Sequence, residues 1–197
     1  MNILVILAHP TPGSFNHAIA ETVVRTLEQL GHSGVFHDLY AEGFVPVLRS
    51  EEILDDDVNP VVGGHCEQLA DADGIILIHP NWWGMPPAIL KGWVDRVIRP
   101  EVAYRFEEED SGEGVPVGIL KAKAAVVFNT SNTPEKRELE VFGDPLENLW
   151  KTCIFDLCGV KKFYRRNFSV VVTSTEEERK GWLEEVGEYI GRVFPAA

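Results

Sequence analysis

Residues 74–98 read GIILIHPNWWGMPPAILKGWVDRVI, in which a short apolar run, a loop and an amphipathic segment follow one another. The run over residues 74–78 lacks polar side chains, which is typical of a strand that is buried on both faces of a parallel sheet. From residue 88 to residue 98 the apolar side chains recur at helical spacing, and the two prolines before them suit the start of a helix. The stretch therefore predicts a strand, a loop and a helix in succession.

The same alternation continues on both sides of this unit. Further apolar runs predict strands at residues 3–8, 34–39, 124–128 and 168–172. Helices are predicted at residues 15–30, 65–70, 88–98, 146–157 and 175–194, the last with Ser174 or Thr175 as its cap and Glu178 completing a capping box. Residues 40–60 and 101–118 are expected to be irregular. Five strands separated by helices predict an α/β fold, a three-layer sandwich with helices on both faces of a parallel sheet.

Composition narrows the class of protein. The chain has 197 residues, 45% of them hydrophobic and 25% charged, which is an ordinary globular mixture and fits one domain over residues 1–197. Its apolar runs fall far short of the ~18 residues that a membrane span needs, so we expect no membrane insertion. No basic segment precedes the first apolar run, so we expect a cytoplasmic protein. The formal net charge of −13 disfavours nucleic acid as a partner.

Three loops follow the predicted strands at the sheet edge where ligands bind in this architecture. The first, residues 9–16, reads HPTPGSFN and leads into a helix, whose free N–H groups and positive end favour an anion. Ser14 and Asn16 would add side-chain donors to this phosphate site. The alternative is an ordinary helix cap by Ser14. The loop matches neither the Walker phosphate loop nor the Gly-x-Gly-x-x-Gly dinucleotide motif.

The other two loops supply a flat surface and polar donors. Trp82 and Trp83 are neighbours and must point in opposite directions, so we expect one of them to face a flat ligand, the alternative being packing under a neighbouring loop. Residues 129–134, NTSNTP, carry small donors, although they could also form a plain turn. A phosphate site, an aromatic surface and polar donors together suit flavin mononucleotide, FMN.

Several segments resemble the flavodoxin-like family of NAD(P)H:quinone oxidoreductases, the DT-diaphorase relatives, in their shorter bacterial type. The most specific is PPAILKGWVDRV at residues 86–97, and the others lie at residues 8–10, 14–16, 38–40, 72–73, 79–83, 103–104, 143–145 and 158–159. The resemblance implies a five-stranded parallel sheet in the order 2-1-3-4-5. It also implies FMN as the cofactor, with FAD as the second choice, and NAD(P)H as the co-substrate.

The resemblance further implies which residues hold the cofactor. The phosphate would lie against the first loop, and the flavin ring would lie on the second and third loops. The implied residues are His9, Ser14, Phe15 and Asn16 for the phosphate, and Pro80, Asn81, Trp82, Trp83, Thr130, Ser131, Asn132 and Thr133 for the ring. The family builds its active site between two subunits, so we expect a homodimer in which Tyr104 or Phe106 covers the flavin of the partner subunit.

The chain departs from the family pattern near the third loop. Mammalian-type relatives have a histidine where this chain has Phe142, and their third loop reads Thr-Thr-Gly-Gly instead of TSNT. Backbone N–H groups of the loop, with Lys136 or Arg137 as a cation, are therefore expected to stabilise the charge of the reduced flavin. The alternative is that both cations point to solvent and pair with neighbouring acids. The catalytic candidates are thus Tyr104 and Arg137.

The expected reaction is the transfer of two electrons as hydride from NAD(P)H through the flavin to a quinone or similar small acceptor. The alternative from another class is a flavin-bearing regulatory subunit of a membrane transporter, such as a potassium-efflux system, docked through the acidic residues 51–57 and 107–113. A one-electron carrier like flavodoxin is a third, less favoured interpretation. The histidines and cysteines lack metal-ligand spacing, so no metal site is expected.

Overall fold

The computed structural model describes residues 1–54, 59–107, 114 and 116–196. Five parallel strands form its main sheet, in the order β2-β1-β3-β6-β7. They are β1 (Asn2–Leu7), β2 (Ser33–Asp38), β3 (Gly74–Pro80), β6 (Ala124–Ser131) and β7 (Lys162–Ser169). Because β6 and β7 are the fourth and fifth strands of this sheet, the predicted order 2-1-3-4-5 is confirmed.

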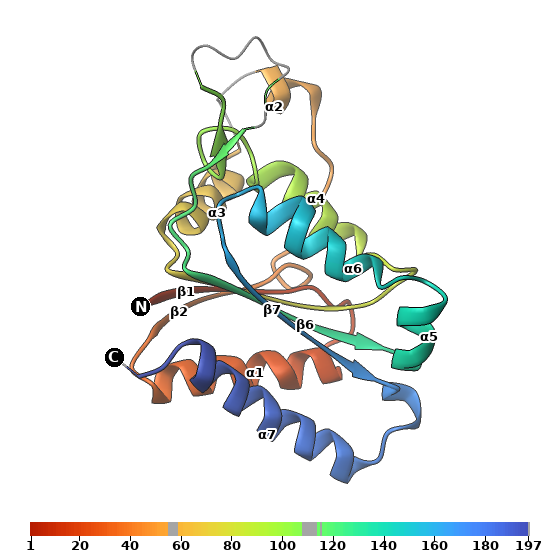
Figure 1. Ribbon diagram of the computed structural model, residues 1–197. Helices are drawn as coiled ribbons and strands as arrows, with labels where there is room; N and C mark the ends of the chain where they lie inside the picture. Colours follow the sequence, from red (N-terminus) through yellow and green to blue (C-terminus); the bar gives the residue numbers. More distant parts are fainter. Residues whose placement is uncertain (55–58, 108–113, 115, 197) are drawn as a thin grey trace.

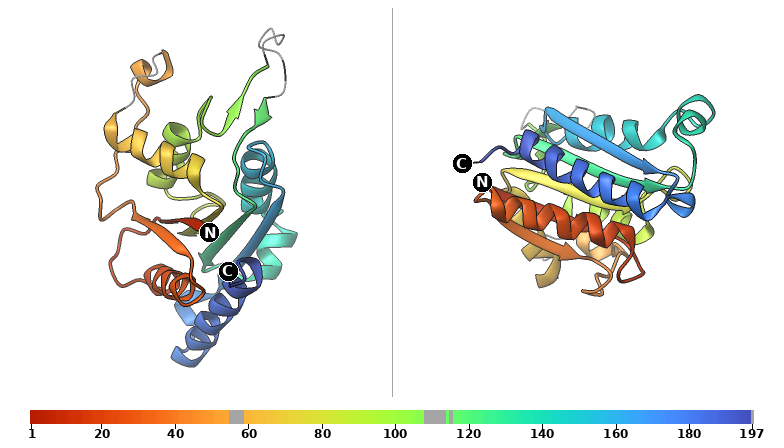
Figure 2. Two further views of the ribbon diagram at one scale, coloured as in Figure 1. Left: turned by 90° about the vertical axis from the view of Figure 1, so that its left-hand side faces the viewer. Right: turned by 90° about the horizontal axis from the view of Figure 1, so that it is seen from below.

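Helices cover both faces of the sheet, as predicted (Figure 1). One face carries α1 (Phe15–Gln29) and α7 (Glu176–Val193), which lie side by side in Figure 2. The other face carries α3 (Pro60–Asp71), α4 (Ala88–Val97), α6 (Pro145–Asn148) and the π-helix η1 (Leu149–Asp156). Alternate side chains of β1 enter opposite hydrophobic clusters, since neighbouring side chains of a strand point to opposite faces.

Local rules account for most helix boundaries. Thr175 and Glu178 form the predicted capping box at the start of α7. Asn59 caps α3, because its side chain accepts the N–H of Val61 at 2.9 Å, and the helix therefore begins five residues before the predicted start at residue 65. Midway along α4, Gly92 lies against the chain at Pro46, whose carbonyl oxygen would be 2.1 Å from any added Cβ. None of the helices in the described ranges is long and apolar enough to cross a membrane.

The predicted fifth strand at residues 168–172 is wrong in its position. β7 ends at Ser169, and the valines that follow form the short 3₁₀ turn η2 (Val171–Thr173). β7 is an edge strand, so its charged residues can reach partners at the rim of the sheet. Arg166, for example, pairs with Glu185 at 2.6 Å and lies over the ring of Phe168. Such a strand has no continuous apolar run from which it could be recognised.

The two segments expected to be irregular contain short elements. β4 (Tyr104–Arg105) and β5 (Val117–Gly118) form an antiparallel pair, and α2 (Ser50–Leu54) lies at the top of Figure 1. Gly118 packs so closely on the end of η1 that a Cβ would lie 2.2 Å from the backbone of Cys158. The predicted helix at residues 146–157 is instead divided between α6 and the π-helix η1.

Candidate functional site

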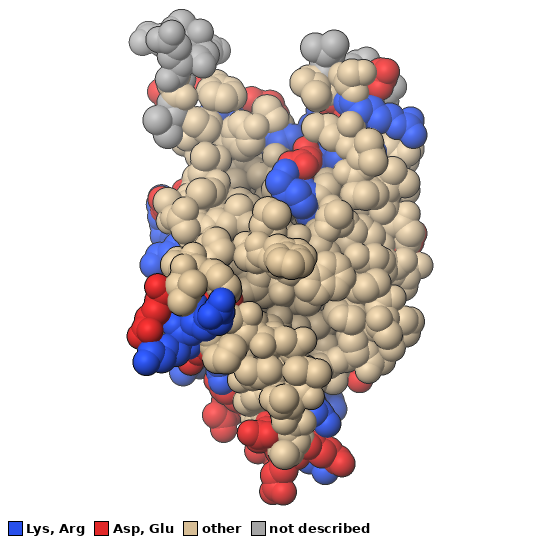
Figure 3. All heavy atoms as spheres, turned by 90° about the vertical axis from the view of Figure 1, so that its right-hand side faces the viewer, with Lys and Arg blue, Asp and Glu red and all other residues tan. Residues whose placement is uncertain are grey.

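A cavity of about 410 Å³ opens where the central strands end. Its lining contains every residue predicted to bind the flavin except Trp83: His9, Ser14, Phe15, Asn16, Pro80, Asn81, Trp82, Thr130, Ser131, Asn132 and Thr133, together with Val171 and Val172. Figure 3 looks at this edge of the sheet, and the middle of the face is free of charged side chains, which lie above it and toward the left and lower edges. The three predicted loops therefore meet in one polar but largely uncharged site.

The first loop presents the start of α1 to the cavity. Ser14 is the N-cap residue of α1, as the alternative has it, but its side chain makes no capping bond to the helix start. Its hydroxyl lies 2.8 Å from Nδ1 of His17, whose other nitrogen is 3.2 Å from a carboxylate oxygen of Asp38. The N–H groups of Phe15 and Asn16 have no acceptor within the helix, as at any helix start, and can meet an anion.

A buried amide links the first loop to the third. The Asn16 side chain is 3% exposed, and its Nδ2 donates to Oγ1 of Thr130 at 2.9 Å. Its Oδ1 is buried without a hydrogen-bond partner among the described residues. A hydroxyl both donates and accepts, so the amide can turn over, keep its bond to Thr130 and direct its N–H₂ at a ligand. Asn16 therefore suits a ligand that accepts hydrogen bonds.

The second loop is a tight turn that exposes one tryptophan. The backbones of Trp82 and Met85 pair at 3.0 Å in both directions, and φ is positive at Trp83 (58°) and Gly84 (74°), as in a type I′ turn. A positive φ at a non-glycine residue costs of order 1–3 kcal/mol and is found most often at functional sites. Trp83 is 97% exposed and Trp82 is 41% exposed. Trp82 faces the cavity, as we expected of one of the pair.

The third loop is tied to residues that the sequence did not single out. Ser131 accepts the N–H of Thr133 at 2.9 Å, and Asn132 accepts the N–H of Val172 at 2.9 Å. The second bond brings Val171 and Val172 to the cavity, where Val172 is 73% exposed. In the sequence these valines look like part of a buried strand. No sequence pattern therefore indicated that they lie beside a ligand site.

A buried polar network supports the second and third loops from the α6 side of the sheet. His79 is fully buried, and its Nε2 accepts the indole N–H of Trp150 at 3.0 Å. Its Nδ1 lies 2.8 Å from the carbonyl oxygen of Pro80. Burial lowers the pKa of His79 to about 4, and the charge of Arg165 lowers it in the same direction. His79 is therefore a neutral ring at neutral pH.

The predicted catalytic candidates do not line this cavity. Lys136 is 4.0 Å from Glu140 in an exposed ion pair, and the guanidinium of Arg137 lies over the ring of Phe142, 5.2 Å from its centre. Tyr104 lies in the β4–β5 hairpin, where its ring contacts that of Phe106 at 5.9 Å. Burial raises the pKa of the Tyr104 hydroxyl. Within one chain, none of these residues lines the cavity.

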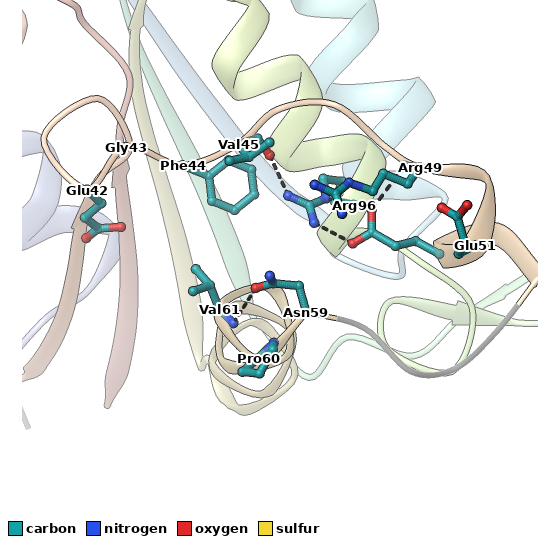
Figure 4. A pocket seen from close by; sticks show the side chains of 11 residues that line it. Glu42, Gly43, Phe44, Val45, Arg49, Glu51, Asn59, Pro60, Val61 and Arg96 are labelled. Carbon is teal, nitrogen blue, oxygen red and sulfur yellow. Dashed lines mark hydrogen bonds and ion pairs between the residues drawn. The ribbon is translucent and has the colours of Figure 1, made fainter.

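A larger cavity, of about 520 Å³, lies elsewhere between α2, α3 and α4 (Figure 4). Its buried charged groups, Arg96 and Glu52, already have partners inside the chain. Arg96 donates to the carboxylate of Glu52 and to the carbonyl of Val45, and the carboxylate pairing holds the pKa of Glu52 below its usual range. Figure 4 also shows Asn59 engaged with its own helix start. Size alone therefore does not make it the functional site.

Three side chains that the sequence keeps apart meet beside β2. His37 lies 2.9 Å from Glu42, and Nε2 of His65 lies 3.8 Å from the same carboxylate, so their ligand atoms form a compact group that could hold a metal ion. However, Nδ1 of His65 accepts the indole N–H of Trp93 at 3.1 Å, so the proton of the neutral ring is on Nε2. That nitrogen has no free electron pair for a metal. The arrangement fits a hydrogen-bonded group better than a metal site.

Comparison with known proteins agrees with this fold. A family model described as flavodoxin-like fold matches residues 1–190. The chain belongs to this flavodoxin-like family. A Haemophilus influenzae protein named "Uncharacterized NAD(P)H oxidoreductase" is 34% identical over 93% of this chain and 91% of its own length. The mouse protein "Ribosyldihydronicotinamide dehydrogenase [quinone]" is 29% identical over 92% of this chain and 87% of its own length.

Solved structures of flavodoxin-like proteins superpose on the chain over almost its whole length. The NAD(P)H:quinone oxidoreductase from Methanothermobacter marburgensis is 26% identical, with a TM-score of 0.80, and the match covers 98% of this chain and 96% of that one. The similarity thus includes the three loops and the strands that carry them.

Proposed function

We propose that the chain is a flavin-dependent NAD(P)H oxidoreductase that passes two electrons by hydride transfer to a quinone or a similar small acceptor. The main support is one observation: the three loops meet in a single cavity at the carboxyl ends of the strands. The names of the relatives, which are NAD(P)H oxidoreductases and quinone-dependent dehydrogenases, support the reaction class.

The residues of the cavity fit FMN. The start of α1 and the amide of Asn16 offer donors to a phosphate, and a volume of about 410 Å³ lies within the usual range for cofactor sites. Trp82 gives a flat apolar surface, and Thr130 and Ser131 line the same cavity and carry hydroxyl groups. Nothing on these loops favours a second nucleotide, so FAD stays the second choice.

A bound flavin would supply the redox chemistry, because it can accept a hydride from NAD(P)H and donate a hydride to the acceptor. The chain's own residues orient the two ring substrates and stabilise charge. The third loop is held by the bonds of Ser131 and Asn132, so its donors are fixed before the reaction begins. Val171 and Val172 line the same cavity and would add apolar surface that keeps water from a bound ring.

A second copy of the chain would complete the site. Tyr104 and Phe106 lie outside the cavity of their own chain, although the resemblance assigns this segment to the active site. In a homodimer, the β4–β5 hairpin of the partner could cover the exposed side of the cavity. We therefore propose that Tyr104 or Phe106 acts across the subunit interface and that Trp83 faces the same substrate space.

The regulatory-subunit alternative has no support in the names of these relatives. The acidic segments that it would use include residues 55–57 and 108–113, which lie outside the described residues. The oxidoreductase proposal is therefore preferred.

The test is to purify the protein, release any bound cofactor, and record its absorption spectrum and mass. FMN and anaerobic bleaching of its absorbance by NADH or NADPH are expected, followed by recovery when a quinone is added. A chain that binds no flavin contradicts the proposal. Flavin that NAD(P)H fails to reduce would favour the one-electron carrier instead.

A further inference from the structure

We propose that Trp150 is a positioning residue for the flavin site, because its indole N–H, together with the side-chain amide of Asn129, donates to Nε2 of His79 and thereby fixes the peptide that starts the second loop. This inference rests on the proposed function only where it concerns flavin. The tautomer is a property of the chain alone and can be measured without any cofactor.

The first step concerns the proton on His79. An indole N–H can only donate, and Nδ2 of Asn129 lies 2.9 Å from the same ring nitrogen, so Nε2 of His79 must offer its electron pair to both donors. In a neutral ring the proton is then on Nδ1, 2.8 Å from the carbonyl oxygen of Pro80, to which it donates. Trp150 and His79 are both fully buried, so water cannot replace either partner.

The second step concerns the peptide between Pro80 and Asn81. The carbonyl and the N–H of a trans peptide point in opposite directions in one plane. His79 binds the carbonyl on one side, and the N–H of Asn81 donates to the carbonyl oxygen of Thr130 at 2.7 Å on the other. This peptide is therefore held at both ends, and its orientation determines how the second loop leaves β3.

The third step connects the three loops. Thr130, which accepts from the Asn81 backbone, also accepts the side-chain amide of Asn16. A single series of hydrogen bonds thus runs from Trp150 through His79 and Thr130 to the start of α1. Trp150 lies in the π-helix η1, a kind of helix that occurs frequently at functional sites. Its indole lines no part of the cavity, so any effect on flavin must pass through His79.

The chain contains a matched control for this arrangement. Trp93 is equally buried and donates its indole N–H to another buried histidine, but to Nδ1 of His65. His65 is therefore expected in the opposite tautomer, with its proton on Nε2. His65 does not line the cavity, and its bond with Trp93 holds no residue of the three loops.

Nitrogen-15 NMR of the histidine rings in the flavin-free protein tests the tautomers. The wild-type spectrum should show His79 protonated on Nδ1 and His65 protonated on Nε2. Trp150→Phe should shift the Nε2 resonance of His79, which loses one of its two donors, and Trp93→Phe should change only His65. A wild-type His79 protonated on Nε2, or a spectrum of His79 that Trp150→Phe leaves unchanged, would overturn the inference.

Titration with FMN tests the consequence. Trp150→Phe should raise the Kd at least tenfold, whereas Trp93→Phe, which loses an equivalent buried bond, should stay within twofold of wild type. His79→Phe should weaken binding as much as Trp150→Phe does, and the double variant should be no weaker than either single one, because both act through one path. Equal effects of Trp150→Phe and Trp93→Phe would reduce Trp150 to a structural residue and overturn the inference. If the wild-type chain binds no FMN, the proposed function fails, and the tautomers are still decided by NMR.

Discussion

His65 and His79 are neutral rings in the interior, and burial lowers the pKa of each from 6.5 to about 4. An exposed histidine in the unfolded chain keeps an ordinary pKa of about 6.5. Between these two values the unfolded chain binds protons that the folded chain does not, so acid favours unfolding. The free energy of unfolding should therefore fall as the pH falls from about 6.5 to about 4, by about 1.4 kcal/mol per pH unit for each ring.

Replacing His79 measures how much this one ring contributes to the pH dependence of the free energy of unfolding. In His79→Phe, the free energy of unfolding should depend on pH less steeply than in wild type, by about 1.4 kcal/mol per unit between about pH 6 and pH 5. That window lies above the ordinary pKa of the carboxyl groups, which limits their contribution. Urea unfolding at several pH values measures the slopes. Parallel curves for the two proteins would show that His79 is protonated in the folded chain.

Asn16 is the residue whose charge should matter most for a phosphate. Asn16→Asp keeps the size of the side chain and can accept a bond from Thr130, but it places a carboxylate beside the start of α1. Since like charges repel, FMN affinity should fall at least tenfold, as judged by flavin retained on purification and by titration.

Asn132→Asp provides the control at the third loop, which lines the same cavity. Its carboxylate can still accept the N–H of Val172, as the amide of Asn132 does at 2.9 Å. We expect a smaller loss of FMN affinity there, because the flavin ring carries no phosphate charge. If the two variants lose affinity equally, the phosphate does not lie at the first loop.

Elements with one strong local pattern were predictable, and elements that depend on distant partners were not. β3 and α4 follow from an apolar run and a helical spacing, and the capping box at Thr175 needs only four residues. β7 could not be found, since its arginines are accommodated by partners such as Asp144 and Glu185, which lie in other elements. The short β4–β5 hairpin likewise depends on the fit of Gly118 against the end of η1.

Two glycines in helices allow the effect of helix propensity on stability to be distinguished from the effect of packing. Gly181 in α7 has open space where a methyl group would be added, whereas the same group at Gly92 in α4 would collide with Pro46. Gly181→Ala should stabilise the protein by about 0.5–1 kcal/mol through helix propensity and a less flexible unfolded chain. Gly92→Ala should destabilise it despite the same gain. Thermal unfolding of both variants measures this, and stabilisation by Gly92→Ala would show that the contact with Pro46 yields easily.

At the scale of the whole molecule, the place of the site was predictable because parallel strands all end at one edge of the sheet. The sequence therefore located the three loops that meet there, but not the network beneath them. His79 and Trp150 are 71 positions apart, and no spacing rule connects them. Val171 and Val172 were missed because their approach depends on one side-chain bond from Asn132.

At the scale of the whole molecule, we predict that the chain forms a dimer. The second loop carries the exposed apolar side chains Trp83 and Met85, and the middle of the face in Figure 3 shows no charged side chain. Burying such a surface favours self-association. Sedimentation at micromolar concentration should give a dimer, and Tyr104→Ala should lower turnover more than flavin content. A monomeric wild-type protein that is fully active would contradict the shared site.

The turn that projects Trp83 into solvent gives the protein an optical reporter of its own. The indole of Trp83 is 97% exposed, while those of Trp93 and Trp150 are at most 1% exposed. Its fluorescence should be red-shifted and open to quenching by iodide, in contrast to the emission of the buried pair. Anything that covers this edge of the sheet, whether a second subunit or an aromatic acceptor, should shield Trp83 from the quencher. Binding at the site can therefore be followed by light emission, without labelling the chain.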